Sequence, residues 1–253
     1  MEYNAMRQFI LPCTLILLFG ATQNILAEDT GFLSDYSNLA AEGSENTRIY
    51  RHPDAFERLA AYQAIMIDQP QLIIAADSKV KSLKPDDMVK LAEAMRITLN
   101  NKLAEDYYIV DQPGPEVLLL RVAASNLYLK KAKRGFLSYT PIGFVVHAAK
   151  SAMTDEITKK ISFVEVNIEA EILDSLSGEQ LVAVVTQRGQ KKDKKQGVKA
   201  DPTTWDEMLA VVEVIGARLD CRLDNARVSQ EEQKDCIALF PEYAVENSEG
   251  SAE

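Results

Sequence analysis

The feature that most restricts the fold of this chain is a stretch of strict alternation at residues 163–174. Apolar side chains at 164, 166, 168, 170 and 172 alternate with polar ones at 165, 167, 169 and 171. A period of two is typical of a β-strand with one face buried and the other in water. Residues 174–178 have turn composition, and residues 180–188 are apolar enough to return as the antiparallel partner strand.

Two long helices are expected on either side of this hairpin in the sequence. Pro85 suits the first turn of a helix, and an apolar stripe follows it at helical spacing to residue 103. Thr204 and Glu207 have the spacing of a capping box, and a second apolar stripe runs on to residue 223. Both stripes can cover one face of a sheet.

The remaining elements complete an α+β pattern. Strands are expected at 64–67 and 72–75 with a break at Pro70, and at 107–111 and 117–129 as a hairpin, with a short helix near 54–61. The predicted fold is a largely antiparallel sheet with helices packed on one face, preceded by an extended N-terminal arm. The predicted organisation is a signal peptide at 1–27, the arm at 28–62, one domain at 63–240 and a disordered acidic tail at 241–253.

The N-terminus predicts export. Arg7 precedes an apolar run at 9–19, and Ala27 precedes the charged residue Glu28, as in a cleavable secretory leader. Cys13 lies in this leader, but Leu11 and Pro12 make a poor lipidation site, so cleavage at Ala27 is favoured over a lipid anchor. We therefore expect a periplasmic or outer-membrane-associated protein.

Cys221 and Cys236 are the two cysteines outside the leader, and in an exported protein they predict a disulfide. Two free buried thiols are the alternative. Fifteen residues of unbroken helix would hold the sulfurs about 22 Å apart, so the chain must reverse near Asn225. Ser229 and Glu232 repeat the capping signal and predict a second, short helix that carries Cys236.

Catalytic and cofactor signals are weak. A net charge of −10 argues against nucleic acid as a partner. Neither His52 nor His147 has metal-ligand or triad spacing, and no phosphate, dinucleotide or nucleophile motif is present, so no cofactor is expected. Glu165, Glu169 and Glu171 share one strand face and could serve acid–base chemistry or bind calcium, but a solvated strand face is the favoured interpretation.

A cationic segment beside an apolar one is the candidate contact surface, together with the arm. Its residues are Lys130, Lys131, Lys133 and Arg134, followed by Phe136, Tyr139, Ile142 and Phe144. Interfacial segments use this pattern, whereas the alternative is a solvated hairpin tip and a loop packed on the core. The lysines at 191–199 form a second basic cluster that could meet anionic envelope polymers or lipid phosphates.

Three stretches together resemble a known family. They are GFLSDYSNL at 31–39, YRHP at 50–53 leading to YQAIMID at 62–68, and EAEILD at 169–174 with SGE at 177–179 and Trp205. This pattern is similar to the bacterial exported proteins of domain-of-unknown-function family 3313, many of which look like lipoproteins. The resemblance implies an exported protein and offers structural rather than catalytic motifs.

The function expected from the sequence is that of an exported envelope protein that binds another envelope protein or component without catalysis. A peripheral contact of the protein with a membrane is a further possibility. One alternative is a hydrolase that uses carboxylates such as Glu165 and Glu169. Another is a secreted structural subunit that associates with itself through an unpaired sheet edge.

Overall fold

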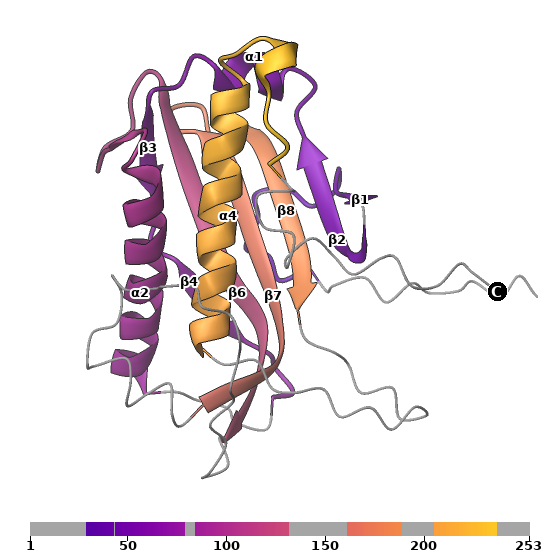
Figure 1. Ribbon diagram of the computed structural model, residues 1–253. Coiled ribbons are helices and arrows are strands. Elements are labelled where there is room, and N and C mark those ends of the chain that lie inside the picture. Colours follow the sequence, from indigo (N-terminus) through magenta and orange to yellow (C-terminus); the bar gives the residue numbers. More distant parts are fainter. Residues whose placement is uncertain (1–28, 43, 79–83, 132–160, 189–204, 237–253) are drawn as a thin grey trace, which may run out of the picture.

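An eight-stranded mixed sheet is the centre of the fold (Figure 1). The computed structural model describes residues 29–42, 44–78, 84–131, 161–188 and 205–236. The strands are β1 (Ala40–Glu42), β2 (Ser44–Arg51), β3 (Ala64–Ile67), β4 (Gln71–Ile74), β5 (Tyr108–Ile109), β6 (Val117–Lys131), β7 (Ile161–Asp174) and β8 (Gln180–Arg188). Their order is β1-β2-β8-β7-β6-β3-β5, with β4 also paired to β6.

The long antiparallel strands β6, β7 and β8 form the middle of the sheet. The predicted strand–turn–strand at 163–188 is therefore confirmed. Val166, Ile168 and Ala170 of β7 face the helices, as the alternation predicts for the apolar face. Because neighbouring antiparallel residues share a face, the register Arg121↔Glu171↔Ala183 places these three side chains together on the opposite face.

The strands around Pro70 are also confirmed. Both β3 and β4 run parallel to β6 and pair with successive parts of it, β3 with residues 117–120 and β4 with residues 123–127. Pro70 lies between them, two residues after Asp68, whose N–H donates to the Leu120 carbonyl of β6 at 3.0 Å. A proline has no N–H to donate, so a break at this point keeps it out of the ladder.

The hairpin expected from residues 107–129 is wrong. β5 pairs in parallel with β3 and not with β6, and β3 lies between them. The side of β6 that β5 would need is taken by β3 and β4. Because β5 and β6 both run parallel to β3, they point in the same direction, and residues 110–116 lead the chain back to the start of β6 instead of forming a hairpin turn.

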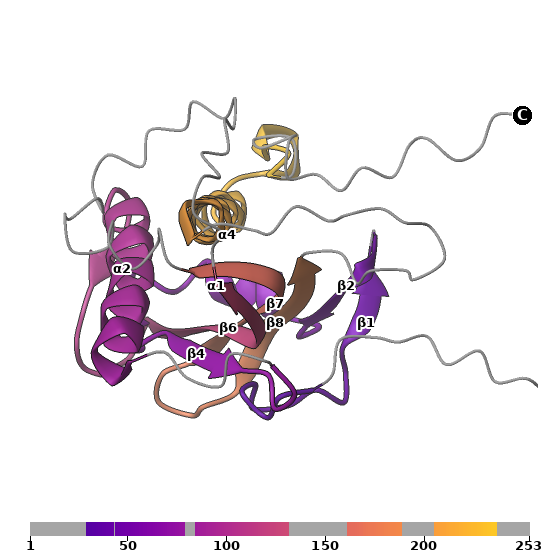
Figure 2. The same ribbon diagram turned by 90° about the horizontal axis from the view of Figure 1, so that it is seen from below.

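Two long helices cover one face of the sheet, which confirms the α+β fold with helices on one face (Figures 1 and 2). The helices are α1 (Ala55–Leu59), α2 (Pro85–Leu103), α4 (Trp205–Asn225) and the single 3₁₀ turn η1 (Gln230–Glu232). α2 and α4 approach closely at Gly216, where a Cβ would lie 3.4 Å from the Lys102 side chain. Thr204, the expected N-cap of α4, lies outside the described residues.

Residues 29–51 cover the opposite face and extend the sheet. Residues 29–39 of the predicted arm cross the sheet without forming a strand, in a series of bends and a turn closed by the Leu39 N–H and the Tyr36 carbonyl at 3.2 Å. Residues 40–51 form β1 and β2, and β2 pairs with residues 182–186 of β8. These two strands cannot be recognised from the sequence pattern, because their polar composition has no clear period.

The β7–β8 turn is held by Asp174, the last residue of β7. Its carboxylate accepts hydrogen bonds from the backbone N–H of Ser177 at 2.7 Å and from the Tyr62 hydroxyl at 2.7 Å. These donors, the Ser177 N–H first, lower the pKa of Asp174 from 3.8 to about 2. The bonds favour the charged form, so the turn is more stable when Asp174 is ionised.

Replacing Asp174 with asparagine should therefore have a pH-dependent effect. A depressed folded-state pKa adds stability above pH 3.8, and this contribution is lost as the pH falls toward 2. After allowance for solvent screening, we expect a loss of about 1 kcal/mol at pH 7. Urea unfolding of the wild type and of Asp174→Asn at pH 7, 4 and 3 measures this loss. Asp77→Asn, at an exposed loop position, is the control. A difference that does not shrink at pH 3 would contradict the assignment.

Candidate functional site

The polar face of β7 is buried, and the expectation of a solvated strand face is wrong. Glu169 is 0% exposed and Glu171 is 1% exposed. The arm at residues 29–39 lies over this face and removes both carboxylates from water. Burying a carboxylate is costly unless it is paired and hydrogen-bonded, so the bonds that these two groups make decide what the face can do.

Glu169 receives hydroxyl donors from both the arm and the sheet. Thr30 Oγ1 donates at 2.7 Å to one carboxylate oxygen, and the Tyr36 hydroxyl donates at 2.5 Å to the other. Ser125 of β6 donates to the same oxygen as Thr30. Burial, followed by the bond to Glu169, raises the pKa of the Tyr36 phenol, which therefore stays protonated as a donor.

Glu171 is neutralised by a cation. Arg121 of β6 donates to it, and Gln180 Nε2 donates at 2.7 Å. From the arm, Ser34 contributes its backbone N–H at 2.9 Å and its hydroxyl at 3.1 Å. Arg121 also lies 3.6 Å from Asp68, so one guanidinium serves a buried and a half-exposed carboxylate.

Apolar contacts accompany these hydrogen bonds. Phe32 and Leu33 of the arm are buried against Ala183 and Val185 of β8, forming a small second core on this face. The ring of Phe32 lies 4.8 Å from the guanidinium carbon of Arg121, a cation–π contact. We call the arm residues 29–39 together with Arg121, Ser125, Glu169, Glu171 and Gln180 the arm clasp.

The arm clasp leaves its carboxylates no accessible oxygen with which to activate a substrate. General acid–base chemistry needs a carboxyl group within hydrogen-bond reach of the substrate. Here the arm and its neighbours fill those positions. Asn167, on the same face, is 0% exposed, and neither its side-chain nitrogen nor its oxygen has a hydrogen-bond partner among the described residues. The side chain of Glu165 lies outside the description.

Comparison with known proteins places the chain in a family. A profile described as "Protein of unknown function (DUF3313)" matches residues 28–219. The chain belongs to this family. The resemblance noted in the sequence is therefore confirmed, and the matched region contains the whole arm clasp. No protein with a curated description matches the chain.

Two of the solved structures that match this DUF3313 protein have low sequence identity to it. Both are PelC dodecamers from Paraburkholderia phytofirmans. One, a PelC variant, is 14% identical to the chain, and the other is 11% identical. Each match has a TM-score of 0.33 and covers 70% of this chain and 95% of PelC.

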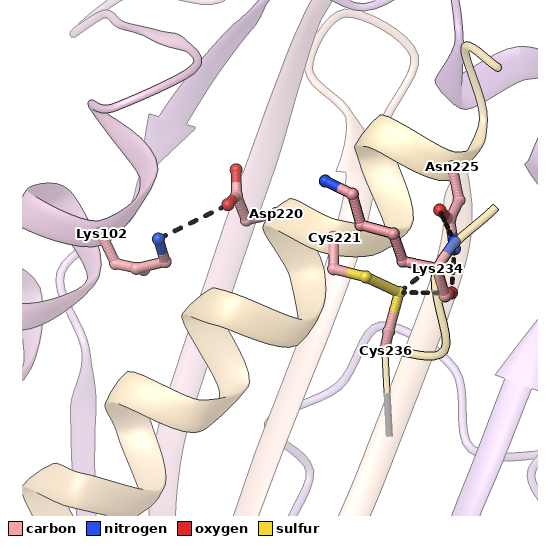
Figure 3. The surroundings of a disulfide bond; sticks show 6 residues. All are labelled: Lys102, Asp220, Cys221, Asn225, Lys234 and Cys236. Carbon is pink, nitrogen blue, oxygen red and sulfur yellow. Dashed lines mark hydrogen bonds and ion pairs between the residues drawn. A yellow bond between two sulfur atoms is a disulfide. The ribbon is translucent and has the colours of Figure 1, made fainter. Parts of the chain in front are cut away.

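The predicted disulfide between Cys221 and Cys236 is confirmed (Figure 3). It joins the last turn of α4 to the segment after η1, with a Cα–Cα distance of 5.7 Å. The chain reverses after Asn225, as predicted, and the side chain of Asn225 holds the returning segment. Its amide nitrogen donates to the Lys234 carbonyl at 2.8 Å, and its oxygen accepts from the Lys234 N–H at 2.9 Å.

The short helix expected to carry Cys236 is wrong in extent. The Ser229–Glu232 capping box is present, but it starts only the 3₁₀ turn η1, and Gln233 is already extended. Cys236 therefore lies beyond the helical turn. The Asn225 bonds and the disulfide hold this segment, so it does not need helical hydrogen bonds.

The candidate contact residues at 130–144 lie mostly outside the part of the chain that the structure describes. Lys130 and Lys131 end β6, opposite residues 161–162 of β7, but their side chains are not described. Lys133, Arg134, Phe136, Tyr139, Ile142 and Phe144 lie outside the described residues, as do His147 and the lysines at 191–199. The contact surface predicted from them stays a prediction.

His52 is described, and it lies beside charged groups. Its Nε2 is 3.3 Å from the Glu179 carboxylate, which also pairs with Arg58 at 2.8 Å. Within the described ranges, no group of three or more His, Cys, Asp or Glu side chains is arranged to hold a metal ion. A search of the same ranges finds no helix of sufficient length and apolarity to cross a membrane.

Arg121 and the hydroxyls of the arm were not anticipated as site residues. Arg121 is a lone cation in an apolar strand at 117–129, and such a residue needs a buried anion to pair with. Pairing this strand with residues 163–174 in the sequence would have brought it close to the glutamates. The clustering of Thr, Ser and Tyr in residues 30–37 is the matching signal for hydroxyl donors.

Removing the Tyr36 hydroxyl should loosen the arm of this DUF3313 protein. This oxygen donates to Glu169 and accepts the backbone N–H groups of Phe32 at 2.9 Å and Leu33 at 3.0 Å. Tyr36→Phe leaves all three groups without this partner and should cost about 1–3 kcal/mol. Urea unfolding and the rate of proteolysis within residues 29–39 measure the effect. Tyr108→Phe, at an exposed tyrosine, is the control, and equal effects would refute the role of the clasp.

Proposed function

We propose that this protein is an exported cell-envelope protein, periplasmic or outer-membrane-associated, that binds another envelope component without catalysis. The occupation of Glu169 and Glu171 by the arm carries the proposal. These are the described carboxylates that strand position suggested for acid–base chemistry, and each is taken by side chains of its own chain. A hydrolase with these groups would need the arm to leave first.

Export is supported by the cysteines and the leader. A disulfide between buried sulfurs persists in oxidising compartments and is rare in the cytosol. Arg7, the apolar run at 9–19 and Ala27 have the order of a cleavable leader. The family match starts at residue 28, the residue that follows the proposed cleavage. A protein of this class meets other envelope proteins or components, and a peripheral membrane contact through residues 130–144 is part of the proposal.

The alternative of self-association through a sheet edge has less support. The strands at the edges of the sheet, β1, β4 and β5, have three, four and two residues. An edge this short offers few unpaired backbone groups to a neighbouring strand, and short edges are one way in which proteins prevent edge-to-edge association. The carboxylate hydrolase is the other alternative, and the arm clasp counts against it.

Cell fractionation with N-terminal sequencing tests the proposal. We expect the protein in the envelope fraction with Glu28 as its first residue. Crosslinking in intact cells, followed by mass spectrometry of the crosslinked product, should then recover an envelope component. Recovery from the cytosol with an intact leader would refute export. Hydrolase activity that Glu169→Gln abolishes, while the folded structure is retained, would refute the non-catalytic role.

A further inference from the structure

The outward side of the arm is polar, so the surface that exposes apolar side chains has to be sought elsewhere. The arm turns Phe32 and Leu33 inward and exposes Ser34, Asp35 and Ser37. Among the described residues, the large apolar side chains that are exposed are Phe56, Val89, Tyr108, Leu176 and Val228. Single exposed apolar residues are ordinary, whereas several on one surface indicate an interaction site.

Four of these five residues belong to segments that meet at Tyr62. Tyr62 donates its hydroxyl to Asp174, two residues before Leu176, and its carbonyl accepts a bond from Arg227, the residue before Val228. Arg58, two residues after Phe56, pairs with Glu179 of the same turn as Leu176. Next to Tyr62, the carbonyl of Gln63 accepts the N–H of Tyr108 at 3.3 Å. We call residues 54–63, 104–108, 174–179 and 224–232 the Tyr62 end.

The Tyr62 end is strongly acidic. Its carboxylate residues are Asp54, Glu57, Glu105, Asp106, Asp174, Glu179, Asp224, Glu231 and Glu232, and its cations are Arg58 and Arg227. Lys102, which lies just before the second of these segments, pairs with Glu105 at 2.7 Å. Both arginines are already engaged, Arg58 with Glu179 and Arg227 with the Tyr62 carbonyl and the Tyr107 ring. The end therefore presents apolar side chains within a net negative field, which attracts a partner of positive charge.

The segments of this end are held together before any partner arrives. The Tyr62 bonds connect α1, the β7–β8 turn and the chain after α4, and the disulfide closes the last of these segments onto α4 (Figure 3). A surface that is already ordered loses little conformational freedom on binding. When a partner buries the exposed apolar side chains of such a surface, little of the free energy gained is offset by the cost of ordering the surface.

We propose that the Tyr62 end is a docking surface for a cationic protein segment that presents apolar side chains between lysines or arginines. It deepens the proposed function by naming the surface and the chemistry of the partner. Its acidic field disfavours an anionic lipid surface. Phe56 and Leu176 are its apolar anchors, and the surrounding carboxylates select the charge of the partner.

Titration of the full chain with labelled peptides tests the proposal. The probes are a 14-residue amphipathic helix of leucine and lysine and its leucine and glutamate analogue, followed by fluorescence anisotropy. We expect binding of the lysine peptide that weakens with salt, and about tenfold weaker binding to Leu176→Ser or Phe56→Ser. Val89→Ser is the matched control, because Val89 is 66% exposed on α2, away from this end, and Leu176 is 63% exposed.

Several results would overturn the proposal. They are equal binding of the glutamate peptide, an equal loss in Val89→Ser, or binding to vesicles of anionic phospholipid that Leu176→Ser weakens. Self-association that Leu176→Ser abolishes would make a second copy the occupant, and binding seen only after removal of residues 241–253 would make the tail the occupant. Because purified protein is used, a negative result here leaves the fractionation test of export untouched, and the reverse also holds.

Discussion

Replacing Arg121 with alanine is expected to lower the free energy of unfolding by about 3–5 kcal/mol. Glu171, which is 1% exposed in the folded chain, would lose its cation. The remaining donors, from Ser34 and Gln180, are neutral groups and cannot offset the buried charge. The loss of the Phe32–guanidinium contact adds to the cost. Chemical denaturation measures the effect, and the arm should become sensitive to protease.

Two further variants show whether the buried charge is the cause. Arg96→Ala breaks a half-exposed pair with Glu93 on α2 and should cost less than about 1 kcal/mol. Adding Glu171→Gln to Arg121→Ala removes the uncompensated charge and should recover part of the lost stability. An Arg121→Ala variant no less stable than Arg96→Ala, or no recovery in the double variant, would show that Glu171 does not depend on Arg121.

Removing the disulfide should produce the second large effect. Closing a 15-residue loop restricts the unfolded chain by about 3 kcal/mol in the entropy model. We expect Cys221→Ser/Cys236→Ser to lose about this much in urea unfolding, while folding is retained because Asn225 still binds Lys234. The wild type without reductant should also run faster than the reduced protein on a denaturing gel.

The control for this prediction is the effect of a reducing agent. Reductant should lower the stability of the wild type to that of the double variant and leave the variant unchanged. Equal mobilities with and without reductant, together with two thiols free to alkylate, would show that the bridge does not form in the protein.

The two predictions concern opposite faces of the sheet and should combine additively. Arg121 lies on the arm face, whereas Cys221 belongs to α4 on the other face. Substitutions at distant sites without shared partners usually add within about 0.5 kcal/mol. A large departure from additivity would indicate that the arm and α4 are coupled through the sheet.

Periodicity in the sequence determined the local elements of this protein. The alternation at 163–174 and the helical stripes after Pro85 and up to residue 223 each predicted the observed element, because side-chain period follows directly from backbone geometry. The disulfide followed from two cysteines in a chain expected to be exported, and the reversal near Asn225 followed from the helix rise between them. These properties depend on residues close in sequence.

Tertiary structure alone decided what the polar face of β7 does. An alternating strand has the same pattern whether water or an arm 133 residues away covers its second face, so the pattern predicts solvated carboxylates at Glu169 and Glu171. The same limit explains the wrong prediction of a hairpin at 107–129. β5 pairs with β3 and not with β6, and the residues of β5 do not encode which strand lies next to it. Pairing and burial depend on contacts between distant segments, and a local pattern does not record which segment supplies them.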